Sequence, residues 1–101
     1  MAVVKWAEPA IRNLEEIAGH IALDKPAAAA RYVKRVLEAV ARLAAFPSSG
    51  SIPPEIPDLP YRQVIVPPCR ILYRVEGKTV WIVHVLRGEK PLDMDELEAS
   101  D

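Results

Sequence analysis

The chain has 101 residues, a formal net charge of -1 and an apolar content of 50%. This length fits one domain, and no apolar run approaches the roughly 18 residues that a membrane span needs. Its single cysteine, Cys69, excludes an internal disulfide framework and a cysteine-based metal cage. The near-neutral charge does not predict nucleic-acid binding. No secretory signal is visible at the start, so we expect a cytoplasmic protein that needs no membrane, metal or cofactor.

The charges are unevenly distributed along the chain. Residues 1–88 hold 12 of the 13 Lys and Arg and 8 of the 14 Asp and Glu, a balance of +4. Residues 89–101 hold one Lys and six acids, a balance of -5. We therefore predict a single, mildly basic domain over residues 1–88 and an acidic C-terminal tail over residues 89–101. Such a tail is either a solubilising end or a partner for basic groups.

The first half of the sequence predicts one strand and two helices. Residues 3–7 are apolar, β-branched or aromatic, as is typical of a strand. Pro9 suits the first turn of a helix, and apolar residues then recur at helical spacing as far as Ile21. Asp24 is expected to cap a second helix that ends near Ala45, just before a proline. Because few residues separate the two helices, they should form an antiparallel hairpin.

The second half predicts a stiff loop and three strands. Residues 48–60 contain four prolines and form the loop. The segments 61–66, 69–76 and 79–87 have the composition of strands, and Gly77-Lys78 joins the last two as a type II′ hairpin. The sequence therefore predicts an α+β domain in which an antiparallel sheet of about four strands packs on the N-terminal helical hairpin.

The two-residue turn also predicts the register of the last hairpin, with Leu72 opposite Val83 and Arg70 opposite Val85. One face of this hairpin is then rich in arginine and carries Arg70, Arg74, Trp81 and Arg87. The other face is nearly all apolar and should pack against the helices. It carries Cys69, Ile71, Tyr73, Val75, Val80, Ile82, His84 and Leu86.

The arginine-rich face is the strongest candidate site. Guanidinium groups that share one surface can bind phosphates or carboxylates through paired hydrogen bonds. We therefore predict a target- or phosphate-binding set formed by Arg62, Arg70, Arg74, Trp81 and Arg87. The alternative is a solvated face on which Arg74 stacks on the ring of Trp81.

Two further side chains could act as acids or bases. The predicted register places His84 on the apolar face opposite Ile71, which favours a hydrogen-bonded structural role over catalysis. Glu55 is either a base or part of a Pro-Pro-Glu turn. Cys69 has no neighbour in the sequence that would activate a thiol.

The order of elements and residues resembles the RelE/ParE superfamily of toxins from bacterial type II toxin–antitoxin modules. The resemblance implies the fold predicted above and an antitoxin that neutralises the toxin. RelE-like members are similar to ribosome-dependent ribonucleases that cut mRNA, whereas ParE-like members are associated with inhibition of DNA gyrase. The matching residues are Val4–Trp6, Pro9, Ala10, Leu14–Ile17, Ile21, Asp24, Pro26–Ala28, Leu43–Pro47, Gly50, Pro54, Glu55, Tyr61, Arg62, Arg70–Arg74 and Ile82–Arg87.

Departures from the ribonuclease pattern favour the ParE-like branch. Glu55 and Arg70 occupy matching places, but Arg87-Gly88 stands where a His-Tyr pair would fall, and no tyrosine follows Tyr73. Our hypothesis is a ParE-like toxin that binds and inhibits DNA gyrase and forms a hetero-oligomer with its antitoxin.

Two alternatives stay open at this point. One is a ribosome-dependent endoribonuclease acting on mRNA, in which Glu55, Arg70, Arg74 and Arg87 would be catalytic and Glu55 or His84 would move protons. The other is a non-toxic binding module on the same fold.

Overall fold

A computed structural model describes residues 1–88, 92 and 97. The chain forms β1 (Val3–Trp6), α1 (Glu8–Ala22), α2 (Pro26–Ala41), a short 3-10 helix (Arg42–Ala44), β2 (Arg62–Val66), β3 (Cys69–Glu76) and β4 (Thr79–Arg87). The predicted strand, two helices and three final strands are confirmed, and the bounds of β3 and β4 agree with the prediction. The predicted acidic tail, residues 89–101, lies outside the described residues apart from Leu92 and Leu97. None of the helices within the described part of the chain is long and apolar enough to cross a membrane.

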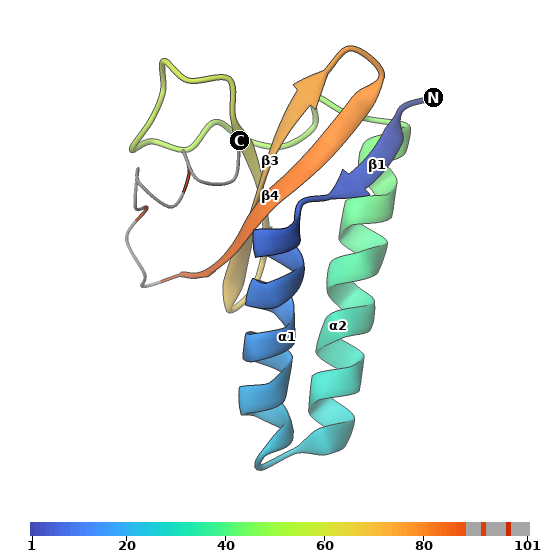
Figure 1. Cartoon of the computed structure of the whole chain (residues 1–101), viewed down its shortest axis with the longest axis vertical. Coiled ribbons are helices and arrows are strands. Elements are labelled where there is room, and N and C mark those ends of the chain that lie inside the picture. Colours follow the sequence, from blue (N-terminus) through green and yellow to red (C-terminus); the bar gives the residue numbers. More distant parts are fainter. Residues whose placement is uncertain (89–91, 93–96, 98–101) are drawn as a thin grey trace.

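The two helices lie side by side and form the predicted hairpin (Figure 1). Ala7 precedes α1 in an extended conformation and a proline follows in the first turn, as the sequence predicts. The predicted cap of α2 is wrong, because Lys25 and not Asp24 occupies the N-cap position before the helix. The helical region is disfavoured for the residue directly before a proline, and here that residue is Lys25.

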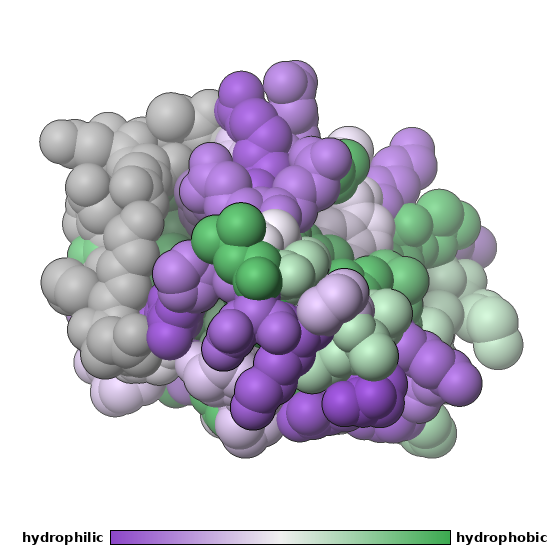
Figure 2. All heavy atoms as spheres, turned by 90° about the horizontal axis from the view of Figure 1, so that it is seen from below, coloured by the Kyte–Doolittle hydropathy of each residue, from purple (hydrophilic) through white to green (hydrophobic). Residues whose placement is uncertain are grey.

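Asp24 instead belongs to the short connection between the helices, and its backbone N–H donates to the Ile21 carbonyl at 3.2 Å. Leu23 in this connection is 86% exposed. Figure 2 looks onto this end of the molecule and shows hydrophobic side chains surrounded by hydrophilic ones.

The four strands are ordered β1-β4-β3-β2 in one sheet. β2 pairs with β3 and β3 with β4 in antiparallel fashion, whereas β1 lies parallel to β4 at the edge. The predicted α+β class is confirmed, with a mixed sheet in place of a wholly antiparallel one. Gly77 has a φ of 59° in the β3–β4 turn, and a type II′ turn requires such a positive φ of its first central residue.

The face of the sheet that packs on α1 and α2 forms the main core. Its side chains are apolar apart from hydroxyl and thiol groups, and Ile71, Tyr73, Val80 and Ile82 are fully buried there. The hydroxyl of Tyr32 on α2 donates to the Val66 carbonyl at 2.7 Å. Burial raises the pKa of the Tyr32 phenol, so this hydroxyl stays a neutral donor that satisfies a buried carbonyl.

A bulge in β4 changes the register of the last hairpin. The predicted pairing holds from the turn to Tyr73 opposite Ile82, but Leu72 then lies opposite His84 and Ile71 opposite Val85. The predicted pairs Leu72–Val83 and Arg70–Val85 are therefore wrong, because two residues of β4 occupy the space of one on β3. In place of His84 and Leu86, Val85 joins the helix-facing core.

A side chain from α1 binds the bulged part of β4. The Oδ1 atom of Asn13 accepts the backbone N–H of Val85 at 3.1 Å and lies 3.1 Å from Nδ1 of His84. The Asn13 side chain thus provides a hydrogen-bond acceptor for a backbone N–H of β4 that lies beyond the part paired with β1. The tight turn at Gly77 therefore sets the register only as far as this tertiary contact.

The opposite face of the sheet, called the outer face below, is covered by the proline-rich loop (Figure 1). Ile56 and Tyr61 of this segment form a second apolar cluster with Leu72, Val83 and Leu97, and Trp81 and Leu92 pack against it. The loop is attached to the sheet by a two-way backbone pair between Ser51 and Gln63, at 2.7 and 3.0 Å. This attachment places the loop beside the predicted arginine site.

Candidate interaction site beside the proline-rich loop

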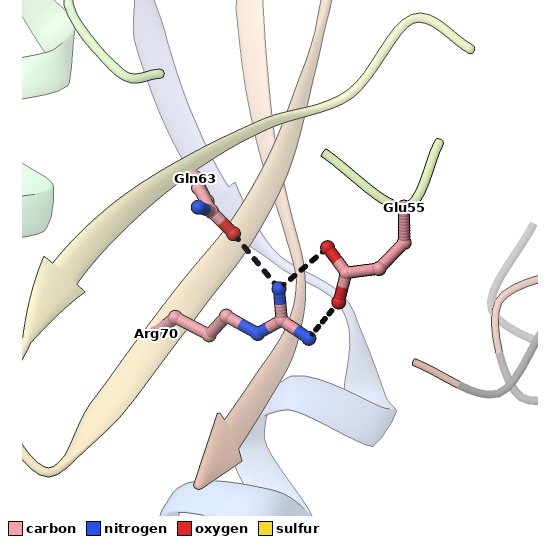
Figure 3. Close-up of polar contacts among 3 residues, drawn as sticks. All are labelled: Glu55, Gln63 and Arg70. Carbon is pink, nitrogen blue, oxygen red and sulfur yellow. Dashed lines mark hydrogen bonds and ion pairs between the residues drawn. The ribbon is translucent and has the colours of Figure 1, made fainter. Parts of the chain in front are cut away.

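Arg70 lies on the outer face, where a side chain from the loop binds its guanidinium group. Nη1 donates to Oε1 of Glu55 at 3.0 Å and Nη2 to Oε2 at 2.5 Å, and Nη1 also donates to Oε1 of Gln63 at 3.2 Å (Figure 3). Only 9% of Arg70 is exposed. Its Nε atom is buried without a hydrogen-bond partner among the described residues. The structure therefore joins Arg70 to Glu55, and the guanidinium does not face open water.

Glu55 acts as the counter-ion of Arg70. The hydrogen bonds from Arg70 hold the pKa of the Glu55 carboxyl below its usual value, so the side chain is ionised near neutral pH. A general base works best with a pKa near the operating pH, and the shift of Glu55 runs the other way. The contact between Glu55 and Arg70 fastens the loop to β3.

Arg74 and Trp81 lie opposite each other on β3 and β4, as the sequence predicts. Nε of Arg74 donates to Oε1 of Glu76 at 3.0 Å. Nζ of Lys5 lies over the Trp81 ring, 5.7 Å from the ring centroid. Lys5 comes from β1, which the sequence pattern did not place next to β4, so sequence reasoning missed this contact.

Arg87 does not share a face with Arg70. It pairs with Cys69 across the β3–β4 ladder, and the Cys69 side chain is buried in the helix-facing core. The prediction that Arg70, Arg74 and Arg87 form one surface is wrong in this respect. The cause is the bulge in β4, which moves every residue beyond it to the opposite face.

Arg62, which pairs with Tyr73, and Arg74, which pairs with Trp81, both line a hollow next to the loop. The hollow has a volume of about 250 Å³ and is lined by Ser48, Ile52, Leu59, Pro60, Tyr61, Arg62, Arg74 and Val75. Nη1 of Arg62 donates to the Gly50 carbonyl at 2.8 Å. Sequence reasoning missed the apolar residues of this lining. The signal that could have found them is the presence of aliphatic residues, such as Ile52 and Leu59, next to the prolines of the loop.

His84 is buried and hydrogen-bonded to Asn13, which confirms the predicted hydrogen-bonded role. The bulge places it opposite Leu72 and not opposite Ile71. Within residues 1–88 and the two described tail positions, no three His, Cys, Asp or Glu side chains come close enough to hold a metal ion.

Comparisons with known proteins agree with this architecture. Residues 4–92 match the family described as ParE toxin of the type II toxin–antitoxin system parDE. "Putative toxin Y4kP" of Sinorhizobium fredii (strain NBRC 101917 / NGR234) is 39% identical over 89 residues, covering 80% of this chain and 88% of the relative.

A solved structure described as a chromosomal ParDE TA system from P. aeruginosa has a similar fold. It superposes with a TM-score of 0.72 at 27% identity and covers 88% of this chain and 98% of that one. The family match spans both helices and all four strands. This chain therefore belongs to the ParE toxin family of type II toxin–antitoxin systems.

Proposed function

We propose that this ParE-type toxin acts in the cytoplasm by binding and inhibiting DNA gyrase, and that a cognate antitoxin neutralises it in a hetero-oligomer. Family membership supports a toxin with an antitoxin partner. The near-neutral charge of the chain favours a protein target over naked nucleic acid.

The observation that carries this proposal is the state of the two candidate acid–base groups. Both oxygens of Glu55 accept hydrogen bonds from Arg70, and His84 is buried in contact with Asn13. A ribonuclease needs a proton-moving group next to cations that hold a phosphate on an accessible surface. An arrangement built for binding fits these contacts better than one built for proton transfer.

Gyrase supercoiling of relaxed plasmid DNA tests the target. Purified toxin should reduce the supercoiled product in a dose-dependent way at micromolar concentrations, and toxin unfolded by heat should not. An unchanged topoisomer ladder with folded protein would contradict the gyrase proposal. Normal growth of cells that express folded toxin without antitoxin would instead support a non-toxic binding module.

The ribonuclease alternative is also worth testing, because Glu55 and Arg70, two of the residues that would be catalytic in it, are in contact. Primer extension on a translated mRNA would reveal cuts within the ribosomal A site if this alternative holds. Glu55→Gln should then abolish the cuts while the protein stays folded. The gyrase proposal predicts that no such cuts occur.

The antitoxin has a candidate docking place at the outer edge of β2. Gln63 already pairs through this edge with Ser51, and by strand alternation Ile65 points its backbone groups to the same side. Ile65 is 56% exposed, and a hollow of about 340 Å³ lies between this edge and α2, lined in part by Ala39 and Leu43. An added strand or an amphipathic helix fits such an edge and groove.

Co-expression with the product of the neighbouring reading frame tests this docking place. The complex should co-elute in size-exclusion chromatography and restore growth, and Ile65→Asp should weaken both. Equal binding by the wild type and Ile65→Asp would place the antitoxin elsewhere.

A further inference from the structure

Two exposed aliphatic residues lie on the side of the helical hairpin that points away from the sheet. Ile11 lies almost opposite Asn13 around α1, and Asn13 contacts β4. Leu37 lies about 140° around α2 from Tyr32, whose hydroxyl contacts β2. Ile11 and Leu37 are 44% and 48% exposed. We call the surface around these two residues the hairpin face. Its charged residues, those within about 100° of Ile11 or Leu37 around their helix, are Glu8, Arg12, Glu15, Lys34 and Glu38.

The two aliphatic residues are at the same height on the antiparallel pair of helices. Ile11 lies 13 residues before Asp24 and Leu37 lies 13 residues after it, and Asp24 belongs to the short connection between the helices. Because both helices rise by the same amount per residue, Ile11 and Leu37 are equally far from the connection.

The charges of the hairpin face have opposite order on the two helices. On α1, Arg12 and Glu15 lie 12 and 9 residues before Asp24, and on α2, Lys34 and Glu38 lie 10 and 14 residues after it. Farther from the connection, α1 therefore carries a cation and α2 an anion. Closer to the connection, α1 carries an anion and α2 a cation. At each height the two helices thus have complementary charges.

This complementarity is not used between the two helices of one chain. The ion pairs of the helices are Glu8–Arg12 at 3.6 Å and Lys34–Glu38 at 4.0 Å. Each joins residues four positions apart on one helix, and all four side chains are more than half exposed. Among the described residues, no ion pair joins α1 to α2. Exposed pairs of this kind contribute little to stability, so these charges can also serve a partner.

We propose that the hairpin face binds the hairpin face of a second copy of this chain, with a two-fold axis parallel to the helices. This rotation places α1 of each copy on α2 of the other at the same height. Ile11 then packs on Leu37 of the other copy, and Glu15 pairs with Lys34 of the other copy. Each contact occurs twice, because a two-fold interface uses the same patch on both copies.

The distribution of charge favours this arrangement over others. α1 carries three acids and one arginine, whereas α2 carries three basic residues and one acid. A two-fold axis across the helices would place each helix on its own equivalent, and charges of like sign would oppose association. A nucleic acid bound to the hairpin face would meet the acids of α1. A second copy in the proposed orientation instead supplies the opposite charge to both helices.

The size of the hairpin face indicates a weak dimer. α2 has 16 residues, so the face is about 24 Å long, and two adjacent helices make it about 20 Å wide. Two such faces bury about 1,000 Å² in total, near the lower limit for specific interfaces. We therefore expect a dissociation constant on the order of 100 µM.

Sedimentation equilibrium of the purified full chain between about 10 µM and 1 mM tests the proposal. The average mass should rise with concentration from 11.2 kDa toward twice that value. In ¹⁵N NMR spectra over the same range, the amides of Ile11 and Leu37 should shift with concentration. Salt at about 1 M should weaken the association, because it screens exposed charges.

Charge reversal identifies the surface involved. Glu15→Lys and Lys34→Glu should each weaken the dimer about tenfold, because each places like charges opposite one another. The double variant Glu15→Lys/Lys34→Glu should restore the wild-type dissociation constant to within about twofold, because it re-forms the pair with its signs exchanged. Asp58→Lys is the matched control: it makes the same charge change as Glu15→Lys on the exposed loop, and it should dimerise at least as well as the wild type. Circular dichroism should show all four variants folded.

Three results would overturn the proposal: a mass that stays at 11.2 kDa up to about 1 mM, no recovery in the double variant, or equal weakening by Asp58→Lys and Glu15→Lys. Association that Ile65→Asp abolishes and the charge reversals leave unchanged would place the contact at β2 and would also overturn it. Each result leaves the gyrase proposal standing, because the supercoiling assay measures that separately.

Discussion

The two faces of the sheet are stabilised by different kinds of contact. The helix-facing side buries apolar residues such as Ile71 and Ile82 completely against α1 and α2. The outer face combines a smaller apolar cluster with the Arg70–Glu55 ion pair and the Lys5–Trp81 contact. Apolar burial is non-directional, whereas ion pairs and hydrogen bonds depend on geometry. The helix-facing side therefore maintains the fold, and the outer face fastens the part of the loop that carries Glu55 and Ile56.

Hydrogen bonds from the helix-facing core also hold the start of the loop in place. The hydroxyl of Tyr73, a residue of the helix-facing core, donates to the Pro47 carbonyl at 2.8 Å and accepts the Gly50 N–H at 2.9 Å. Burial raises the pKa of this phenol, so it stays protonated and can do both. The start of the loop is thus held by Tyr73 of the main core, and its later part by the Ser51–Gln63 pair, the second apolar cluster and Arg70.

Ile82→Ala should have the largest effect on stability, because it leaves a cavity in the fully buried, helix-facing core. We expect a loss of about 4 kcal/mol in the free energy of unfolding, measured by urea denaturation. Ile65→Ala, on β2 of the same sheet but 56% exposed, should cost less than about 1 kcal/mol. Similar losses in both variants would contradict the idea that the helix-facing side carries most of the stability.

Gly50→Ala should have the next largest effect, because it disturbs the contact between the loop and the core. A Cβ atom at this position would lie 2.5 Å from Oη of Tyr73 and 2.7 Å from the Gln63 carbonyl oxygen. We expect a loss of about 2–3 kcal/mol, together with altered NMR shifts along the loop.

Gly19→Ala is the matched control for this substitution. A Cβ atom there would meet nothing within 4 Å, and the residue lies inside α1. Alanine should therefore stabilise the protein by about 0.5–1 kcal/mol. If Gly50→Ala stabilised the protein as much as Gly19→Ala, that result would contradict the close approach of the loop to Tyr73.

Glu55→Gln should have a smaller, pH-dependent effect on the outer face. Near neutral pH we expect a loss of about 1–2 kcal/mol, below that for a fully buried pair because the Glu55 side chain is 38% exposed. The pKa of Glu55 is lower in the folded chain than its ordinary 4.5. The stabilisation is therefore complete above that pH and disappears as the pH falls through the folded pKa.

Urea denaturation of both proteins between neutral pH and about pH 3 measures this dependence. The difference in unfolding free energy between the wild type and Glu55→Gln should shrink as the pH is lowered. A difference that stays constant over the whole range would show that the charge of Glu55 does not hold the loop.

The sequence predicted the elements well and the candidate site only in part. Helical spacing, two helix-starting prolines and the Gly77-Lys78 turn are local signals, and the helices and strands follow them closely. The common surface predicted for Arg70, Arg74 and Arg87 is not present in the structure. Arg70 binds a residue 15 positions away, and Arg87 changes face because of a bulge.

Periodicity and turn chemistry therefore determined what each segment became, because both act between residues close in the chain. The tertiary structure decided the bulge in β4, where Asn13 reaches a strand about 70 residues later, and the pairing of β1 with β4. It also decided which charges neutralise one another and which of them border the hollow. Such choices depend on contacts between distant segments, which exist only once the helices and the loop have packed on the sheet.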